Sequence, residues 1–398
     1  MIDTKKIGRS AYGIKTPIIQ TGDNLIDIVI RSVEAFNKGE FKKGDIIAVT
    51  EAVVAIAQGN YASKAQIVKD IERKFEGSKV LAIVDPIQSR NRFVGVLEAI
   101  AETPSLEKIV IAMSYPSDEV GNALISNLQL IESGVNASSD VLTMEEFEEK
   151  FGKPCHHFTK QNYPQMYMDV CKQAGKEVEI VLCNDFSKLA ENYGCNDYLV
   201  CSIHRAEETK SIIKRAGGNP RILTLADIMN ESVDGSGYSP KYGLYGTNKR
   251  DGGSLKLMPR DCQEFVDEIK RRIFETYGVE IEAMVYGDGA FKDPVGHIWE
   301  LADPTTTLAA TSGLSGTPKE VKLKYIASAH ENKSPEEVAA IVAEMAAKRR
   351  SSDDMSSNES LGTTPRQICD LVASLCDLVS GSGDECTPVV LISNYLKS

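Results

Sequence analysis

The 398-residue chain has no long apolar run. No stretch approaches the roughly 20 consecutive apolar residues that a membrane-spanning helix needs. The amino-terminal sequence MIDTKKIGRS also lacks the apolar segment of a secretory signal. We therefore expect a cytoplasmic protein with no membrane partner. Its hydrophobic content of 42% is still enough for a full core, and its length favours more than one domain.

Positive charge is also scarce. The 45 lysines and arginines are outnumbered by 57 aspartates and glutamates, which leaves a formal net charge of −12 at pH 7. A chain this acidic is a poor partner for nucleic acid or for an anionic membrane surface. An anionic substrate would have to be held by a local cation or by a bound metal ion.

The common short motifs of zinc, redox and nucleotide sites are missing. Nine cysteines are scattered without any CxxC pair, which indicates reduced thiols used as small core residues. No GxGxxG or GxxxxGK[ST] motif follows any predicted strand. The sequence therefore contains neither a dinucleotide fingerprint nor a P-loop.

Apolar periodicity predicts an α+β fold of the mixed α/β kind. An amphipathic helix over 25–36 precedes a buried strand at 46–49. From about residue 61 to residue 238, strands such as KVLAIVDP, KIVIAMSYP and VEIVLCND alternate with helical segments. That alternation predicts a parallel α/β layer. The last third returns to mixed elements.

Three glycine-containing loops carry acids. The carboxyl-terminal run CDLVSGSGDECTPVVLIS breaks a helix at two glycines and places Asp384 and Glu385 before an apolar strand, while Asp251 lies in YGTNKRDGG and Asp288 follows the strand VEIEAMVY. Such loops can hold a divalent ion or bring N–H groups against phosphate oxygens. Each acid could equally be a turn residue, because Asp-Gly is a common turn signal.

Five separated blocks together resemble the coenzyme F-420:L-glutamate ligase family, the gamma-glutamyl ligases of the deazaflavin coenzyme. The blocks are TPIIQTGDNL, GDIIAVTEAVVAIAQGN, YGTNKRD with the following GGSLKLMPRD, MVYGDGAFKDP, and DLVASLCDLVSGSGDECTPVVLI. The resemblance covers roughly residues 10–60 and 240–398. It implies a two-lobed ligase core formed by residues 1–60 and 241–398, with residues 61–240 as an inserted α/β block.

The resemblance also implies a reaction and its site. The family members are GTP-dependent ligases that phosphorylate a carboxylate of the acceptor and let the amine of L-glutamate displace phosphate, with Mg or Mn ions bridging nucleotide and protein. A homodimer is implied as well. The positions that correspond to metal sites are Asp288, Asp251, Asn248, Gly289, Ser382 and Glu385. Those that correspond to nucleotide contacts are Thr16, Pro17, Ile18, Ile19, Glu51, Ala52, Asp251, Gly381, Gly383, Asp384 and Pro388.

Several of these positions depart from the family pattern. Asn248 stands where the family has a metal-binding aspartate, and Asp251 stands where it has an asparagine, so acid and amide are exchanged three residues apart. Gly289 replaces a metal-binding serine or threonine, and Ser382 replaces a glutamine. The loop that contains Asn248 and Asp251 therefore keeps a carboxylate, but three residues away from the position it has in the family.

A lysine expected at the nucleotide is replaced by Ile56. Because a charge-assisted hydrogen bond contributes on the order of 1.5–3 kcal/mol, its loss weakens nucleotide binding unless another cation substitutes. The candidate cations that could replace this lysine, judged only by their place in the sequence, are Lys15, Lys249 and Arg250.

These departures leave other functions open. The acceptor could be a folate or another pterin-like molecule instead of a deazaflavin. The chain could also be a non-catalytic nucleotide-binding regulatory protein derived from the ligase, which the missing lysine favours and the three acidic loops disfavour. Finally, the inserted block could carry an unrelated activity at its strand ends.

Overall fold

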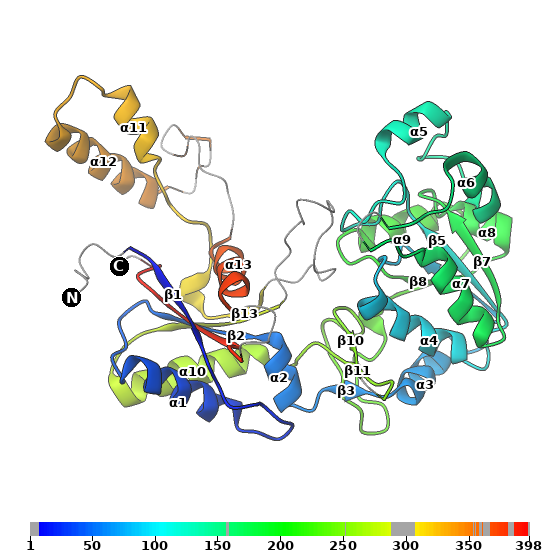
Figure 1. Cartoon of the computed structure of the whole chain (residues 1–398), viewed down its shortest axis with the longest axis horizontal. Coiled ribbons are helices and arrows are strands. Elements are labelled where there is room, and N and C mark those ends of the chain that lie inside the picture. Colours follow the sequence, from blue (N-terminus) through cyan, green and yellow to red (C-terminus); the bar gives the residue numbers. More distant parts are fainter. Residues whose placement is uncertain are drawn as a thin grey trace.

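The computed structural model describes residues 8–156, 159–250, 252–287, 307–352, 354, 356–357, 360, 367–380 and 386–396. These residues form two lobes with a small sheet between them (Figure 1). One lobe, the core lobe, contains both ends of the described chain, and the other is the inserted layer. The predicted mixed α/β class is confirmed.

A five-stranded sheet forms the centre of the core lobe. Its strand order is β1 (Ser10–Ile14), β14 (Val389–Ser393), β2 (Ile46–Thr50), β12 (Glu282–Tyr286) and β13 (Thr307–Ala310). Only the neighbours β2 and β12 run parallel, and the other pairs are antiparallel. The first strand of the chain therefore pairs with the last one, so both ends of the described chain help to build this sheet.

Helices cover both faces of this sheet, which explains why β2 is apolar from Ile46 to Val49. Successive strand residues point to opposite faces. Ile47 and Val49 pack with α1 (Leu25–Asn37) and α10 (Cys262–Tyr277). Ile46 and Ala48 pack with α13 (Ile368–Ser380) on the other face. The short helix α2 (Glu51–Ala57) starts directly at the end of β2.

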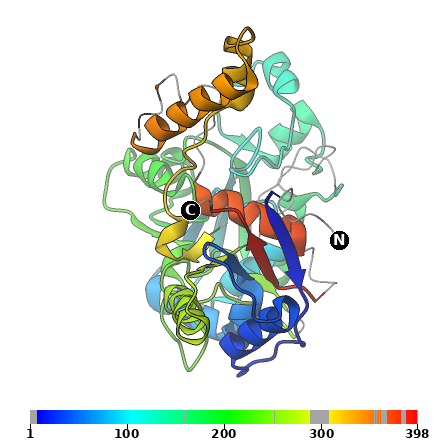
Figure 2. The same ribbon diagram turned by 90° about the vertical axis from the view of Figure 1, so that its left-hand side faces the viewer.

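Two further helices of the core lobe form an arm, shown in orange in Figure 2. They are α11 (Leu323–Ala329) and α12 (Pro335–Arg350). The N-cap of α12 is Ser334, whose side chain accepts a hydrogen bond from the Glu337 N–H while the Glu337 side chain bonds back to the cap. This is the capping box that SPEE predicts.

The inserted layer contains a six-stranded sheet. Its order is β6 (Leu142–Thr143), β7 (Glu177–Leu182), β5 (Lys108–Met113), β4 (Val80–Val84), β8 (Asp197–Val200) and β9 (Arg221–Thr224). All neighbours are parallel except the edge pair β6 and β7. The parallel layer predicted from alternating strands and helices is therefore present, and all six strands fall between residues 61 and 240.

The helices of the inserted layer lie on both faces of this sheet. One face packs against α3 (Lys64–Lys74), α4 (Gly95–Glu102) and α7 (Tyr163–Gln173). The other packs against α8 (Lys188–Tyr193) and α9 (Ala206–Lys214), while α5 (Asn127–Ser133) and α6 (Met144–Phe151) lie in the long β5–β7 connection. The chain leaves β4 toward one face and the neighbouring β8 toward the other. The gap between β4 and β8 is therefore the topological switch point, where α/β sheets usually bind ligands.

A small connecting sheet joins the two lobes. It consists of β3 (Tyr61–Ala62), β11 (Leu255–Lys256) and β10 (Asn248–Lys249), all antiparallel. The chain thus leaves the core lobe at β3 and returns beside the same strand at β11. The division of the sequence at residues 60 and 240 stays a prediction, since this sheet draws on both sides of it.

Two compositional expectations can be compared with the structure. All nine cysteines lie in the described ranges, none forms a disulfide and six are buried, as expected for reduced core thiols. No helix in the described part of the chain combines the length and the apolar character that crossing a membrane requires.

Candidate functional site

Two parallel strands of the core lobe end at the same edge. Thr50, the last residue of β2, pairs in register with Tyr286, the last residue of β12. Glu51 follows immediately as the first residue of α2. The predicted metal positions Asp288 and Gly289 lie outside the described residues, but the chain that leads to them leaves β12 beside Glu51. Carboxyl ends of parallel strands are the usual place for ligand groups.

The amino-terminal and carboxyl-terminal segments reach this same edge. The Thr16 N–H donates to the Cys386 carbonyl oxygen at 3.1 Å, and the Thr50 N–H donates to the Pro388 carbonyl oxygen at 3.0 Å. The buried Thr387 hydroxyl donates to the Ser380 carbonyl oxygen at 2.7 Å, which joins the chain before 381–385 to the chain after it. The predicted positions Gly381, Ser382, Gly383, Asp384 and Glu385 lie outside the described residues.

The predicted nucleotide residues near the amino terminus point in different directions. Ile18 is 79% exposed, whereas Ile19 is buried in the core. The Thr16 hydroxyl donates to the Pro17 carbonyl oxygen at 2.9 Å. Ala52 is half-buried in the first turn of α2. The structure therefore brings Thr16, Glu51 and Pro388 to one edge, with Ile19 as an anchor in the core.

A buried ion pair lies at this edge. The Lys256 Nζ is 2.6 Å from Glu51 Oε1 and 2.7 Å from Glu51 Oε2. The two side chains are only 8% and 1% exposed. Asn248, a predicted metal position, is the residue directly opposite Lys256 in the β10–β11 pair, and directly opposite residues in an antiparallel pair share one face. Glu51, Lys256 and Asn248 form what we call the Lys256 cluster.

The sequence analysis did not predict Lys256. Its only sequence signal is a lysine in the apolar run SLKLM, where a buried charge needs a partner. The partner, Glu51, is 205 residues away, so the pair cannot be read from local spacing. It takes the connecting sheet to bring Lys256 to the end of β2.

The other candidate cations are engaged elsewhere. Ile56 is half-buried against the core of the core lobe, so its side chain belongs to an apolar contact. The Lys249 Nζ lies 2.6 Å from Glu98 Oε1, and the Arg250 guanidinium lies over the Tyr61 ring at 3.8 Å. Lys15 is exposed. Lys256, in contrast, lies beside the predicted nucleotide residue Glu51.

The surroundings of Glu51 are poorly solvated. Burial raises the pKa of the Cys262 thiol at the start of α10 to about 12, and the charge of Glu51 adds to this rise. Cys262 therefore stays protonated at neutral pH and is not a nucleophile. In such surroundings a charge acts more strongly on a neighbouring group than it would in water.

A metal ion at this edge would need ligands from residues beyond those described. Within the described ranges, no three His, Cys, Asp or Glu side chains are arranged to hold a metal ion. Asn248 offers one amide oxygen, and Glu51 is occupied by Lys256. Hard divalent ions need several oxygen ligands. The carboxylates that would complete a site are Asp251, Asp288 and Glu385, which lie outside the described residues.

A second polar cluster lies at the switch point of the inserted layer. Asp85 follows β4 directly, in a left-handed conformation with φ of 54°. Its Oδ1 accepts hydrogen bonds from the Ser114 hydroxyl at 2.6 Å and from the Arg205 guanidinium at 2.8 Å. Glu119 accepts from the N–H groups of Ile203 and His204 at 2.9 and 3.0 Å. Burial raises the pKa of Glu119, and the charge of Asp85 adds to this effect.

The buried carboxyl group of Asp118, next to Glu119, should make the stability of the protein depend on pH. Burial raises its pKa from 3.8 to about 6, although N–H donors from Gln88 and Asn122 oppose the rise. A raised carboxyl pKa means that Asp118 contributes stability which is fully present below the unfolded pKa and is lost as the pH rises through about 6. We expect the difference in unfolding free energy between wild type and Asp118→Asn to grow, by on the order of 2–3 kcal/mol, as the pH falls from 7 to 4.

Urea denaturation at several pH values measures this difference, and Asp140→Asn is the matched control. The pKa of the Asp140 carboxyl is lowered, first by the Asn136 N–H. The stability that Asp140 contributes is therefore lost as the pH falls. The difference in unfolding free energy between wild type and Asp140→Asn should shrink at low pH, whereas the difference between wild type and Asp118→Asn should grow. Parallel curves for the two variants would show that Asp118 is not held in its protonated form by burial.

Comparison with known proteins gives one match. The model of the family described as F420-0:Gamma-glutamyl ligase matches residues 13–394. The match runs across the core lobe and the inserted layer alike. No curated protein matches the chain significantly.

Proposed function

The chain belongs to the F420-0:gamma-glutamyl ligase family, and from this premise we propose that it is a GTP-dependent ligase that joins L-glutamate to an activated carboxylate of a deazaflavin acceptor. The family indicates an amide-bond-forming ligase. The nucleotide, the metal ions and the acceptor are parts of the proposal, as are the cytoplasmic location and the homodimer.

The observation that supports this function is the meeting of distant segments at one edge of the core lobe. Thr16, Glu51, Asn248 and Pro388 come from four separate blocks of the sequence, and backbone hydrogen bonds and the Lys256 pair hold them at the ends of β2 and β12. Phosphoryl transfer relies on positioning and on neutralising the charge of the phosphate oxygens. An edge that gathers separate segments around a buried lysine meets both needs.

Lys256 supplies the cation that Ile56 does not. An ammonium group has three N–H donors, and the carboxylate oxygens of Glu51 lie within bonding distance of Nζ. We expect the remaining donor to bind a phosphate oxygen of GTP or of the phosphorylated acceptor. Glu51 then fixes the lysine in place and keeps it charged while the site excludes water.

Metal ions are the second source of positive charge in the proposal. Asp288, Asp251 and Glu385 would hold Mg or Mn together with Asn248, with Gly289 and Ser382 as neighbouring positions in the loops. When bound, the ion would neutralise charge on the phosphate oxygens. These loops suit a hard divalent ion, because together they contain three acids and one amide oxygen.

The direct test is product formation from defined substrates. Purified protein is incubated with GTP, Mg or Mn, L-glutamate and a deazaflavin acceptor, and mass spectrometry follows the glutamylated acceptor while phosphate release is measured. We expect phosphate release to require the acceptor, because acyl phosphate formation precedes attack by the amine. Parallel reactions replace the deazaflavin by folate and GTP by ATP.

The outcomes separate the candidate functions. A glutamylated folate without a glutamylated deazaflavin would change the acceptor but keep the ligase. Binding of GTP without turnover of any acceptor would favour the non-catalytic regulatory protein, which the replacement of the family lysine by Ile56 supports. Failure to bind GTP at all, by a protein shown to be folded, would overturn both.

A further inference from the structure

The inserted layer carries a polar site that lies apart from the edge at which we propose the ligase reaction. It lies where β4 and β8 diverge, because the chain runs from β4 to α4 on one face and from β8 to α9 on the other. The Asp85–Arg205 ion pair at 2.8 Å joins the loops that follow these two strands. Strand ends at such a switch point form a crevice that suits a ligand.

Buried polar atoms in these two loops lack partners among the described residues. They are Asp85 Oδ2, Gln88 Oε1, Ser202 Oγ and Arg205 Nε. Asp85, Gln88 and Ser202 are 1%, 3% and 0% exposed. Buried polar groups are nearly always hydrogen-bonded, and each exception calls for a water molecule or a ligand. Three of the four atoms can accept a hydrogen bond, so the ligand should bring donors.

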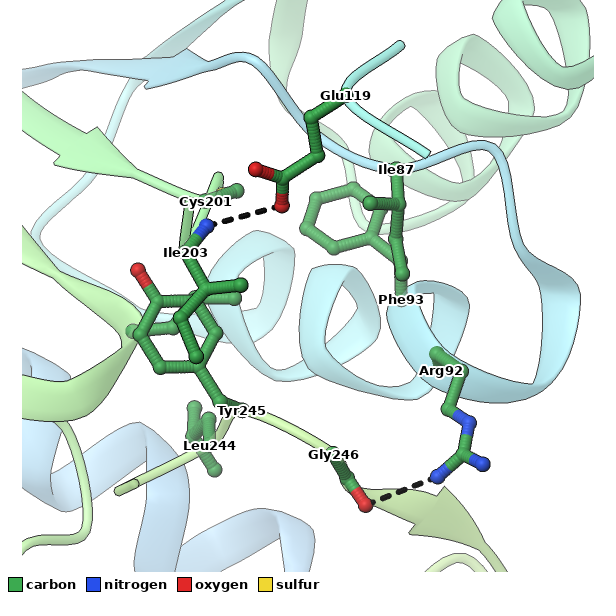
Figure 3. A pocket seen from close by; sticks show the side chains of 10 residues that line it. Ile87, Arg92, Phe93, Glu119, Cys201, Ile203, Leu244, Tyr245 and Gly246 are labelled. Carbon is green, nitrogen blue, oxygen red and sulfur yellow. Dashed lines mark hydrogen bonds between the residues drawn. The ribbon is translucent and has the colours of Figure 1, made fainter. Parts of the chain in front are cut away.

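A narrow hollow lies between apolar walls in these same loops. Figure 3 shows Ile87 and Phe93 on one side and Ile203 and Tyr245 on the other, with Glu119 at one end. At the opposite end the Arg92 guanidinium donates to the Gly246 carbonyl oxygen at 3.0 Å. Asp85 and Gln88 lie in the same loop as Ile87, and Ser202 lies between the lining residues Cys201 and Ile203.

The hollow is closed in the described structure. Its volume is about 20 Å³, which is room for about one water molecule. A larger ligand must therefore part the walls. The Arg92 bond to Gly246 crosses from the β4 side to the chain that leads into β10, and so does the bond from the Thr247 hydroxyl to the Arg92 carbonyl oxygen at 3.4 Å. Opening would break both contacts.

We propose that this switch-point site binds a nucleoside-like molecule, with its sugar hydroxyls at Asp85 and Gln88 and its planar base between the Phe93 and Tyr245 walls. A hydroxyl group can donate to Asp85 and accept from Arg205 at the same time. Flat apolar walls suit an aromatic ring. The loop after β4, DPIQSRN, has no glycine, so it offers side-chain acceptors in place of a phosphate cradle.

Isothermal titration with adenosine and guanosine tests the site. These nucleosides lack the phosphates that the proposed ligase reaction needs, and the full chain is used without added metal. Binding is expected for at least one of them. The 2′,3′-dideoxy analogue should bind at least about tenfold more weakly, because it leaves the buried acceptors without donors.

Variants locate the binding. Asp85→Asn should weaken it about tenfold or more, since it replaces a charged acceptor. Ser202→Ala should weaken binding severalfold. It is less liable to disturb the fold, because the Ser202 hydroxyl has no hydrogen-bond partner among the described residues. Ser105→Ala is the matched control. Its hydroxyl is also buried without a partner among the described residues, but it precedes β5 and so lies at the opposite edge of the sheet.

Three results would overturn the inference. One is the absence of nucleoside binding by folded wild type at the highest soluble concentration. Another is equal affinity for the dideoxy analogue, or unchanged affinity in both Asp85→Asn and Ser202→Ala. The third is loss of binding in Glu51→Gln/Lys256→Met, which would place the nucleoside at the core lobe. Since the inference does not rest on the ligase reaction, any of these results leaves glutamylation to be tested separately.

Discussion

The double variant Glu51→Gln/Lys256→Met is expected to keep the wild-type fold and to lose most of its GTP-dependent glutamylation at GTP concentrations near the wild-type KM. Lys256 and Glu51 form a buried pair with both side chains almost fully covered. Replacing both charges of such a pair is often neutral for stability, whereas removing one leaves a buried charge and costs about 3–5 kcal/mol. Loss of a charge-assisted contact to phosphate should raise the KM for GTP about tenfold to a hundredfold.

Single variants separate binding from folding. Lys256→Met alone should melt earlier than the double variant, because it leaves Glu51 charged and unpaired. Glu51→Gln keeps the lysine and should keep more activity than the double variant. Lys249→Met is the matched control, since Lys249 lies in the same connecting sheet but pairs with Glu98 at the surface. Its kinetics should match wild type.

The measurements are initial rates against GTP concentration and melting curves for all four variants. Full activity in the double variant would mean that Lys256 serves only to neutralise Glu51. The cation for the phosphate would then have to come from elsewhere, and the Lys256 cluster would be a structural ion pair.

Asp288→Ala is expected to abolish metal-dependent turnover. The chain leaves β12 at Tyr286, in register with Thr50 and therefore beside Glu51, and Asp288 follows two residues later. A metal ion at a phosphoryl group contributes several kcal/mol of transition-state stabilisation, so the loss should be on the order of a hundredfold or more. Titration of Mn should show weaker binding in the variant.

An exposed aspartate of the same lobe provides the control. Asp267 on α10 is exposed and accepts a hydrogen bond from Gln263, so Asp267→Ala should bind Mn as wild type does. Equal Mn affinity in Asp288→Ala and wild type would remove Asp288 from the metal site. Turnover that persists after exhaustive chelation would remove the metal from the reaction.

Much of the fold could be predicted from local pattern. Strands buried on both faces are largely apolar, so β2, the parallel strands β4 and β5, and the second half of β7 are visible as short apolar runs. Helix starts such as Ser334 are encoded by a few neighbouring residues. These features depend on short stretches of chain, and the structure contains them where the sequence predicts them.

The site could be predicted only in part. The resemblance singled out Glu51, Asn248 and Pro388, and the structure brings these residues to one edge, although their roles remain predictions. Lys256 could not be found in this way, because β10, β11 and β3 are two residues long and carry no measurable periodicity. The polar cluster of the inserted layer was also missed, since Asp85 and Arg205 are 120 residues apart.

The connecting sheet also bears on the order in which the chain can fold. Ala62 and Leu255 are paired neighbours, and β2 must meet β12 across everything that lies between them. Closing a flexible loop of roughly 190 residues costs about 5 kcal/mol in chain entropy. The inserted layer forms its six-stranded sheet from its own residues, so folding of this layer first would shorten that loop before the core lobe closes. A large insertion can therefore be carried within an enzyme core without the full entropic penalty of its length.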